Sequence, residues 1–447
     1  MYIAPPVEAS TPESRKQQVR AAHLLERDAQ LNLPTSQKFL RDMEQKRLYR
    51  GTWTSVFSLM RDGRDLAERL DRAARLEGEK RIIELRKFID PYVQVVETDS
   101  VCELTGLSLV DVWRYFRHTW NTPYFSTPGR KMSFLVRDRA ARYHPVIGIG
   151  ALGSSIVQLT PRDKWIGWSP DSFLLSLAAE PTTLHARWLL SSLNTALQGV
   201  SISDFLRDGV LTRAELRQPT ERTILRLRQL SEKERRLHHL FPSRNEHKVA
   251  TTRMTRADWK AQAGSHLFRS KRALLLARLL EARVALLDAG FVKATAPALR
   301  QALKSARARK AVRFVLRYVK SAHVGVDMMD ITVCGAVAPY NAILGGKLVS
   351  LMMASPAVTA ACQRKYSRAS SVIASSMAGQ AVRRKPRIVL LGTTSLYDVA
   401  PSQYNRLRVP AELAGGLPGE ELQFIQLGKT VGFGSYHFSR DTMAALE

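Results

Sequence analysis

A glycine pair followed by a lysine is the part of this sequence that comes nearest to a phosphate-binding motif. It lies in the stretch PYNAILGGKLVSLMMASP, from Pro339 to Pro356. A helix that begins near Gly346 would direct unpaired backbone N–H groups, together with Lys347, towards a phosphate or carboxylate. The Walker loop is longer and needs a hydroxyl group where Leu348 stands, which excludes a P-loop NTPase. An anion site and a tight turn of small residues both remain open, and we favour the anion site.

Polar side chains gather in the segments that follow this stretch. Hydroxyl and amide groups at the ends of apolar strands such as RIVLL can converge on one ligand. Turns and helix caps account for some of them, but not for the run from Gln403 to Arg406. The predicted ligand or anion pocket consists of Tyr340, Asn341, Gly345, Gly346, Lys347, Thr394, Ser395, Tyr397, Ser402, Gln403, Tyr404, Asn405 and Arg406.

No recognisable catalytic motif accompanies the predicted pocket. The sequence lacks G-x-S-x-G and H-E-x-x-H, and the acidic residues of the C-terminal region do not have the spacing of a metal site. Tyr404 has no apparent activating base, so a structural role is favoured over that of a nucleophile. Cys102, Cys334 and Cys362 lack zinc-ligand spacing and predict no disulfide. We therefore assign no catalytic residue, no metal and no cofactor.

The sequence is strongly basic, with a formal charge of +28. A protein this basic repels itself unless a polyanion neutralises it, and nucleic acid is the commonest polyanion. Residues 211–320 contain 27 Lys and Arg against 8 Asp and Glu, and no acidic residue lies between Asp288 and Asp327. A solvated helix face normally mixes both signs, so phosphate contact is favoured over solvation. The predicted nucleic-acid-binding residues are Arg269, Lys271, Arg272, Arg300, Lys304, Arg307, Lys310, Arg313, Arg317 and Lys320.

The hydrophobic periodicity divides the chain into four segments of an α+β protein. Residues 1–121 are predicted to form a helical N-terminal region, 122–175 the first strands of an α/β core, 176–324 a large basic helical insertion, and 325–447 the C-terminal α/β core. Helical patterning extends through DPYVQVV to Trp120, and the aromatic residues Trp113, Tyr115, Phe116 and Trp120 fit a packed helix.

Residues 148–153, GIGALG, match the G-x-G-x-x-G pattern of dinucleotide-binding loops. That pattern requires a helix directly after the glycines, whereas SSIVQLTP continues as β-like sequence. We therefore interpret the motif as a strand that contains glycines. After Asp330, the order of a strand, the glycine corner, a helix and the strand RIVLL indicates a βαβ-like unit in a mixed sheet.

No segment has the character of a membrane span. The apolar run ALLLARLLEARVALL is interrupted by Arg278, Glu281 and Arg283. The N-terminus lacks a basic region followed by an apolar one, as a secretory signal would have. We expect no membrane association and a cytoplasmic location.

Several motifs occur together in one order in the C-terminal region. They are ITVCGAVAPYNAILGGKLVSLMMASP, SSVIAS, TTSLY, SQYNRL and LGKTVGFG, preceded by IGIGALGSSIVQLTPRDKWIGWS. Through them the sequence resembles the DruA family of the Druantia anti-phage defence system. The resemblance implies an antiviral role together with other Druantia subunits, including a helicase.

The order of strand, glycine corner, helix and strand is also distantly similar to acetyltransferases of the GNAT type. This similarity implies a GNAT-like mixed α/β core, in which a glycine loop and a helix N-terminus bind the pyrophosphate of acyl-CoA. Gly345-Gly346-Lys347 departs from the R/Q-x-x-G-x-G/A motif of that family. We therefore transfer the fold and not the activity.

The leading hypothesis is a nucleic-acid-binding component of a prokaryotic anti-phage system, with DNA favoured over RNA. The basic helical segment would hold the phosphate backbone, and the predicted pocket would bind a strand end, a nucleotide or a partner. Two alternatives remain open. One is a GNAT-like acyltransferase that binds a CoA-type cofactor at the glycine corner, and the other is a non-enzymatic scaffold whose basic region docks an acidic partner.

Overall fold

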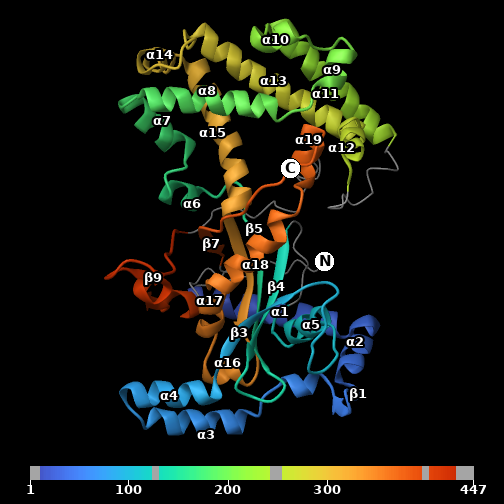
Figure 1. The fold of residues 1–447 in the computed structure, drawn as a ribbon, viewed down its shortest axis with the longest axis vertical. Coiled ribbons are helices and arrows are strands. Elements are labelled where there is room, and N and C mark those ends of the chain that lie inside the picture. Colours follow the sequence, from blue (N-terminus) through green and yellow to red (C-terminus); the bar gives the residue numbers. More distant parts are fainter. Residues whose placement is uncertain (1–10, 123–129, 242–253, 395–401, 429–447) are drawn as a thin grey trace. The chain divides into compact units, whose positions relative to one another are not determined.

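The computed structural model describes residues 11–122, 130–241, 254–394 and 402–428. The chain forms two compact units, each built from segments that are distant in the sequence (Figure 1). Unit 1 takes its described residues from 11–155, 328–362 and 388–428, and unit 2 takes them from 156–327 and 363–387.

Unit 1 is built around a five-stranded sheet in the order β3-β4-β5-β6-β7 (Figure 1). The strands are β3 (Pro91–Val96), β4 (Lys131–Asp138), β5 (Val146–Ser154), β6 (Met328–Ala336) and β7 (Leu390–Thr393). Neighbouring strands are antiparallel, except that β6 and β7 are parallel. Two separate hairpins pair β1 (Arg47–Tyr49) with β2 (Thr52–Thr54) and β8 (Arg408–Pro410) with β9 (Glu421–Gln423).

Helices cover both faces of this sheet, because its central strands are apolar on both sides. Leu135 of β4 packs in one cluster with Phe116 of α5, and Val136 packs in another with Val349 of α17. Alternate residues of a strand point to opposite faces, so consecutive apolar residues bury both. The other elements of unit 1 are α1 (Pro12–Leu31), α2 (Pro34–Glu44), η1 (Val56–Leu59), α3 (Gly63–Ala74), α4 (Gly78–Phe88), α5 (Leu109–His118), α16 (Tyr340–Ile343), α17 (Lys347–Met353), α20 (Ser402–Asn405) and η2 (Ala411–Ala414).

The glycines of the G-x-G-x-x-G match lie in β5, which confirms their interpretation as part of a strand. A side chain on Gly148 would overlap Val349, and a side chain on Gly150 would overlap Met353. Both neighbours belong to α17, so the glycines allow this helix to lie close against the strand. The pattern reflects helix–sheet packing and not a dinucleotide-binding loop.

Residues 91–96 form a strand, although the sequence pattern predicted that helical structure continues through them. This prediction was wrong for β3, which pairs antiparallel with β4 along its whole length. The strand contains Val93, Val95 and Val96, and β-branched side chains fit a pleated surface better than a helix. The hairpin of β1 and β2 also interrupts the region that was predicted to be helical.

The predicted βαβ-like unit is confirmed. Strand β6 is followed by α16, α17, α18 (Pro356–Ser367) and α19 (Val372–Ala378), after which the chain returns as the parallel strand β7. Helices together with a mostly antiparallel sheet confirm the α+β class. The GNAT-like core and the four-segment division remain predictions.

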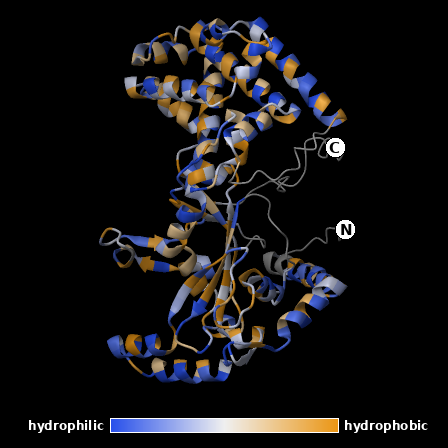
Figure 2. Ribbon diagram, turned by 45° about the vertical axis from the view of Figure 1, so that its right-hand side comes forward, coloured by the Kyte–Doolittle hydropathy of each residue, from blue (hydrophilic) through white to orange (hydrophobic). Residues whose placement is uncertain are grey.

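Unit 2 is helical in the part of the chain that the structure describes. Besides α19, its elements are α6 (Thr160–Trp165), α7 (Pro170–Ala179), α8 (Thr183–Gln198), α9 (Ser203–Arg207), α10 (Arg213–Arg217), α11 (Glu221–Leu240), α12 (Arg256–Ala263), α13 (His266–Asp288), α14 (Ala296–Ala302) and α15 (Ala306–Asp327). Hydrophobic and hydrophilic residues alternate along these helices (Figure 2), as expected for helices with one buried side.

Helix α13 forms the centre of the unit 2 core. Leu276 and Leu280 of this helix cluster with Leu227 of α11, Leu193 of α8 and Val312 of α15. A helix that packs against several neighbours is apolar around most of its circumference and has no single hydrophobic stripe. The surrounding helices α11 and α15 are amphipathic, and their polar sides supply much of the charged surface of unit 2.

Candidate ligand pocket and basic surface

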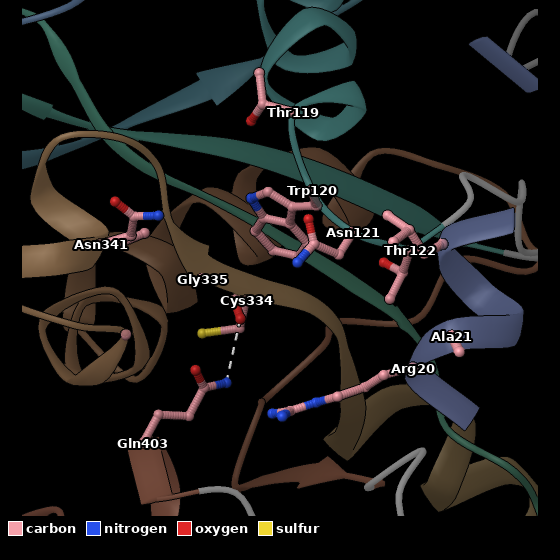
Figure 3. A pocket seen from close by; sticks show the side chains of 13 residues that line it. Arg20, Ala21, Thr119, Trp120, Asn121, Thr122, Cys334, Gly335, Asn341 and Gln403 are labelled. Atoms are coloured by element: carbon pink, nitrogen blue, oxygen red, sulfur yellow. Dashed lines mark hydrogen bonds between the residues drawn. The ribbon is translucent and has the colours of Figure 1, made fainter. Parts of the chain in front are cut away.

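A pocket of about 740 Å³ lies in unit 1 (Figure 3). Its size falls within the range of about 300–1,000 Å³ that is usual for small-molecule sites. Asn341, Gly346 and Gln403, which belong to the predicted pocket, are among the residues that line it. The described residues that line it are Arg20, Ala21, Leu24, Thr119, Trp120, Asn121, Thr122, Cys334, Gly335, Ala336, Asn341, Gly346 and Gln403.

Gln403 and the glycine corner meet at one side of the pocket. The Nε2 atom of Gln403 donates a hydrogen bond of 3.2 Å to the backbone carbonyl of Cys334, which ties α20 to β6 (Figure 3). A side chain on Gly346 would overlap Oε1 of Gln403. Gly345 has a φ angle of +65°, in the left-handed region that favours glycine. The turn requires a glycine at position 345, and the packing of Gln403 requires a glycine at position 346.

Helix α17 begins at Lys347 and contains only 7 residues. Its macrodipole is the sum of few aligned peptide units, so its N-terminus offers little attraction to an anion. The side chain of Lys347 is exposed and is not part of the pocket lining. The tight turn, which the sequence left as the second alternative, accounts for both glycines, and the anion site remains a prediction.

A second wall of the pocket is the segment that follows α5. Thr119 is the C-cap of that helix, so the chain leaves the helix at Trp120. Arg117 fixes this segment, because its guanidinium donates to the carbonyl oxygen and the Oγ1 of Thr122 at 2.8 and 3.0 Å. The same guanidinium lies 5.0 Å from the centre of the Trp120 ring. On β6, the absence of a side chain at Gly335 leaves room for the indole, since a Cβ would lie 2.8 Å from it.

Sequence reasoning missed Trp120 as a pocket residue, because it grouped this residue with the buried aromatics of α5. Trp113, Tyr115 and Phe116 are indeed in the core. The run TWNT, an aromatic residue among polar ones after the end of an amphipathic helix, was the available signal. Arg20 gave no such signal, because its approach to β6 depends on the tertiary packing of α1.

Tyr340 was predicted to line the pocket, but the structure places it elsewhere. Its side chain is fully buried, and its hydroxyl donates a hydrogen bond of 2.8 Å to Oδ2 of Asp138. Arg61 donates to the same oxygen at 2.8 Å. Tyr340 therefore joins α16 to β4 in a structural network.

Other predicted pocket residues also lie outside the lining. Tyr404 is buried and packs against Phe424, with ring centroids 4.8 Å apart. The described residues Gly345, Lys347, Thr394, Asn405 and Arg406 are not among the lining residues. Ser395, Tyr397 and the side chain of Ser402 lie outside the described part of the chain.

The groups near the pocket favour binding over covalent chemistry. Burial raises the pKa of the Cys334 thiol to about 12. Burial also raises the pKa of the neighbouring Tyr404 hydroxyl. Both groups therefore stay protonated at neutral pH, whereas a nucleophilic thiol must be ionised.

In unit 2, five of the predicted nucleic-acid-binding residues remain exposed on α13, α14, α15 and the turn that joins the last two, and we call this set the basic surface. Their side chains are exposed, and the described residues supply no acidic partner to them. They are Lys271, Arg300, Lys304, Lys310 and Arg317. Arg307 is exposed and Arg313 is partly exposed, and both are paired with surface acids. Arg307 pairs with Glu221 and Asp288, and Arg313 pairs with Asp171.

The remaining three predicted contacts serve the fold, which corrects their assignment. Lys320 is buried, and its Nζ lies 2.6 Å from Oδ2 of Asp163. Arg272 is buried, and it binds Asp204 at 2.6 Å. Arg269 contacts the same Asp204 at 2.8 Å. Asp163 of α6 thus neutralises Lys320 of α15, and Asp204 of α9 neutralises Arg269 and Arg272 of α13.

Two kinds of feature are absent from the residues that the structure describes. No helix in that part of the chain is long and apolar enough to cross a membrane. No group of three or more His, Cys, Asp and Glu side chains there is arranged to hold a metal ion.

Comparison with known proteins identifies the family. A family model described as Druantia protein DruA matches residues 66–179 and 298–447. Druantia protein DruA of Escherichia coli (strain UMEA 4076-1) is 30% identical over 113 residues, which is 25% of this chain. The chain thus spans about a quarter, 24%, of the curated relative that it matches. No solved structure matches the chain. Because the family model covers more than half of its residues, the chain belongs to the DruA family.

Proposed function

We propose that the protein is the nucleic-acid-binding component of a Druantia-type anti-phage system. It acts in the cytoplasm with other Druantia subunits, which include a helicase. Membership of the DruA family supports the defence role, since the curated relative is named as a Druantia protein. The observation that carries nucleic-acid binding is the basic surface, where five exposed cations have no acidic partner among the described residues.

The distribution of acids in unit 2 supports this proposal. Asp163, Asp204 and Glu234 are engaged by buried or half-buried cations inside the unit. These acids are therefore not available to neutralise the exposed lysines and arginines. A phosphate backbone supplies regularly spaced negative charge and releases bound counterions when it is contacted.

Salt dependence provides the test in solution. The full chain is titrated with duplex and single-stranded oligonucleotides at several NaCl concentrations. Each phosphate contact contributes a slope of about −0.9 to the plot of log affinity against log salt for duplex DNA. Replacement of all five residues of the basic surface by Gln is expected to remove several of these contacts and flatten the plot.

A charge-matched control separates this surface from general electrostatics. The control replaces three lysines and two arginines that are exposed in unit 1, namely Lys38, Lys46, Arg64, Lys80 and Arg86. It lowers the net charge by the same amount and should retain most of the slope. Equal slopes for the two variants, or wild-type affinity that does not change with salt, would refute the proposal.

The defence role is tested in cells that carry the complete gene set. The basic-surface variant should lose protection in a phage plaque assay, and the unit 1 control should keep it. Partner subunits should be recovered with the protein after nuclease treatment. Recovery that nuclease abolishes would mean that nucleic acid alone bridges the proteins.

A further inference from the structure

The unit 1 pocket has a lining that is rich in carboxamides and contains no carboxylate among the described residues. Asn121, Asn341 and Gln403 supply the carboxamides, and Arg20 is the one cation among the described residues of the lining (Figure 3). Arg20 and Gln403 extend towards the middle of the pocket from opposite sides in this view. Because the described lining residues include no carboxylate, the pocket does not repel a negatively charged ligand, and its carboxamides suit a polar one.

The carboxamides place donors and acceptors side by side. Asn341 uses its Oδ1 to accept the backbone N–H of Ala342 at 2.8 Å, which leaves its amide hydrogens for a ligand. Asn121 and Asn341 are both exposed. Asparagine and glutamine pair with the edges of nucleobases because each edge also presents a donor next to an acceptor.

Trp120 gives the pocket an aromatic wall. Arg117 and Gly335 hold the indole in place, as described above, so the wall exists without a ligand. The indole Nε1 is buried and has no hydrogen-bond partner among the described residues. Unpaired bases are commonly bound against aromatic side chains while polar groups read their edges.

We propose that this pocket binds a nucleobase together with its attached phosphate. The carboxamides contact the edge of the base, Trp120 contacts its ring, and Arg20 attracts the phosphate. The base belongs either to a free mononucleotide or to the end of a strand. This inference goes beyond polymer binding by the basic surface, because it concerns unit 1 alone.

Binding is measured on the full chain with named probes. Calorimetry and tryptophan fluorescence follow titration with dAMP, dGMP, dCMP and dTMP, with dinucleotides that carry a 5′-phosphate, and with inorganic phosphate. At least one mononucleotide or dinucleotide should bind saturably and at least about tenfold more tightly than phosphate, which is about 1.4 kcal/mol. Tighter binding of the dinucleotide would indicate a strand end as the source, and tighter binding of the mononucleotide would indicate a free nucleotide.

The double variant Asn121→Ala/Asn341→Ala tests the assigned contacts without removing a buried side chain. It should weaken nucleotide binding at least about tenfold, as expected for the loss of hydrogen bonds that read a base. Asn32→Ala, at an exposed asparagine outside the pocket lining, is the matched control and should leave binding unchanged. The basic-surface variant should also bind mononucleotides normally, so that failure of this proposal is distinguishable from failure of the polymer-binding proposal.

Three results would overturn the inference. The first is no binding of any mononucleotide or dinucleotide to the folded protein. The second is binding that the double variant does not weaken. The third is an affinity for 4′-phosphopantetheine, which has no base, that equals the affinity for acetyl-CoA, because the pocket would then recognise the thiol arm and not the base.

Discussion

Asp163 is the acceptor at the centre of a buried ion network in unit 2. Its side chain accepts from Lys320 at 2.6 Å and from Arg162 at 2.8 Å, and all three side chains are almost completely buried. A buried charge that loses its partner is far more costly than an exposed one, because water cannot replace the lost contact. The network joins α6 to α15, although 157 residues separate Asp163 from Lys320.

Asp163→Asn should therefore lower the free energy of unfolding by about 3–5 kcal/mol, since it leaves Lys320 and Arg162 without a countercharge. Denaturation with urea, followed by circular dichroism, measures the change. Asp71→Asn is the matched control, because the Asp71–Arg75 pair is exposed on α3. An exposed pair contributes about 0–1 kcal/mol. Equal losses in the two variants would contradict the structural role of Asp163.

His118, at the end of α5, gives unit 1 a pH-dependent stability. Burial, together with the nearby Arg114 and Arg117, lowers its pKa to about 4. The pKa of an unfolded histidine is about 6.5, so the unfolded chain binds a proton first as the pH falls. Stability is unaffected above about pH 6.5, and it decreases as the pH falls from there towards 4.

His118→Gln should flatten this dependence between pH 7 and pH 4.5, as measured by urea midpoints at each pH. The matched substitution His239→Gln, at an exposed histidine in unit 2, should leave the wild-type dependence in place. A dependence that persists in His118→Gln would show that another group takes up the proton.

At the scale of elements, local patterns predicted some strands and helices well. The glycine-containing strand β5 and the order of β6, α17 and β7 followed from glycine position and apolar runs. Strand β3 was missed because the amphipathic helices before and after it dominate the local periodicity and outweighed the signal of its three valines, whereas its pairing with β4 depends on tertiary structure. Of the predicted pocket residues, Asn341, Gly346 and Gln403 line the cavity, whereas its other walls come from α1, the end of α5 and β6, which local patterns do not bring together.

The packing of α17 on β5 makes Gly150 a sensitive position. Gly150→Ala should destabilise unit 1 by about 1–3 kcal/mol, because the added methyl group overlaps the sulfur of Met353. Thermal unfolding measures the effect. The double variant Gly150→Ala/Met353→Ala should be less destabilised than the sum of the two single variants, since removal of the sulfur relieves the overlap. Simple additivity would show that the two side chains do not meet.

At the scale of the whole molecule, the composition gives the net charge directly, but the fold determines which of the charged side chains are exposed. The total of +28 was available from the sequence. The sequence did not show which cations remain exposed, because Asp163 and Asp204 reach their partners only through tertiary contacts. The exposed surplus favours contact with a polyanion and disfavours the isolated protein through self-repulsion.

This self-repulsion should be visible without any ligand. When NaCl is raised from 0.1 to 1 M, the screening length falls from about 10 Å to about 3 Å, so the thermal midpoint of the free protein should rise. The basic-surface variant carries five fewer positive charges, and its midpoint should rise less because it has less repulsion to screen.

Duplex DNA should stabilise the wild-type protein at 0.1 M NaCl and lose that effect at 1 M, since binding of the folded state raises the midpoint only while it persists. Differential scanning calorimetry measures the thermal midpoints of the free wild-type protein, the free variant and the DNA-bound wild-type protein at each NaCl concentration. Identical salt responses of the wild-type protein and the variant would show that the exposed cations of unit 2 do not repel one another, and the charge argument for a polyanion ligand would lose its basis.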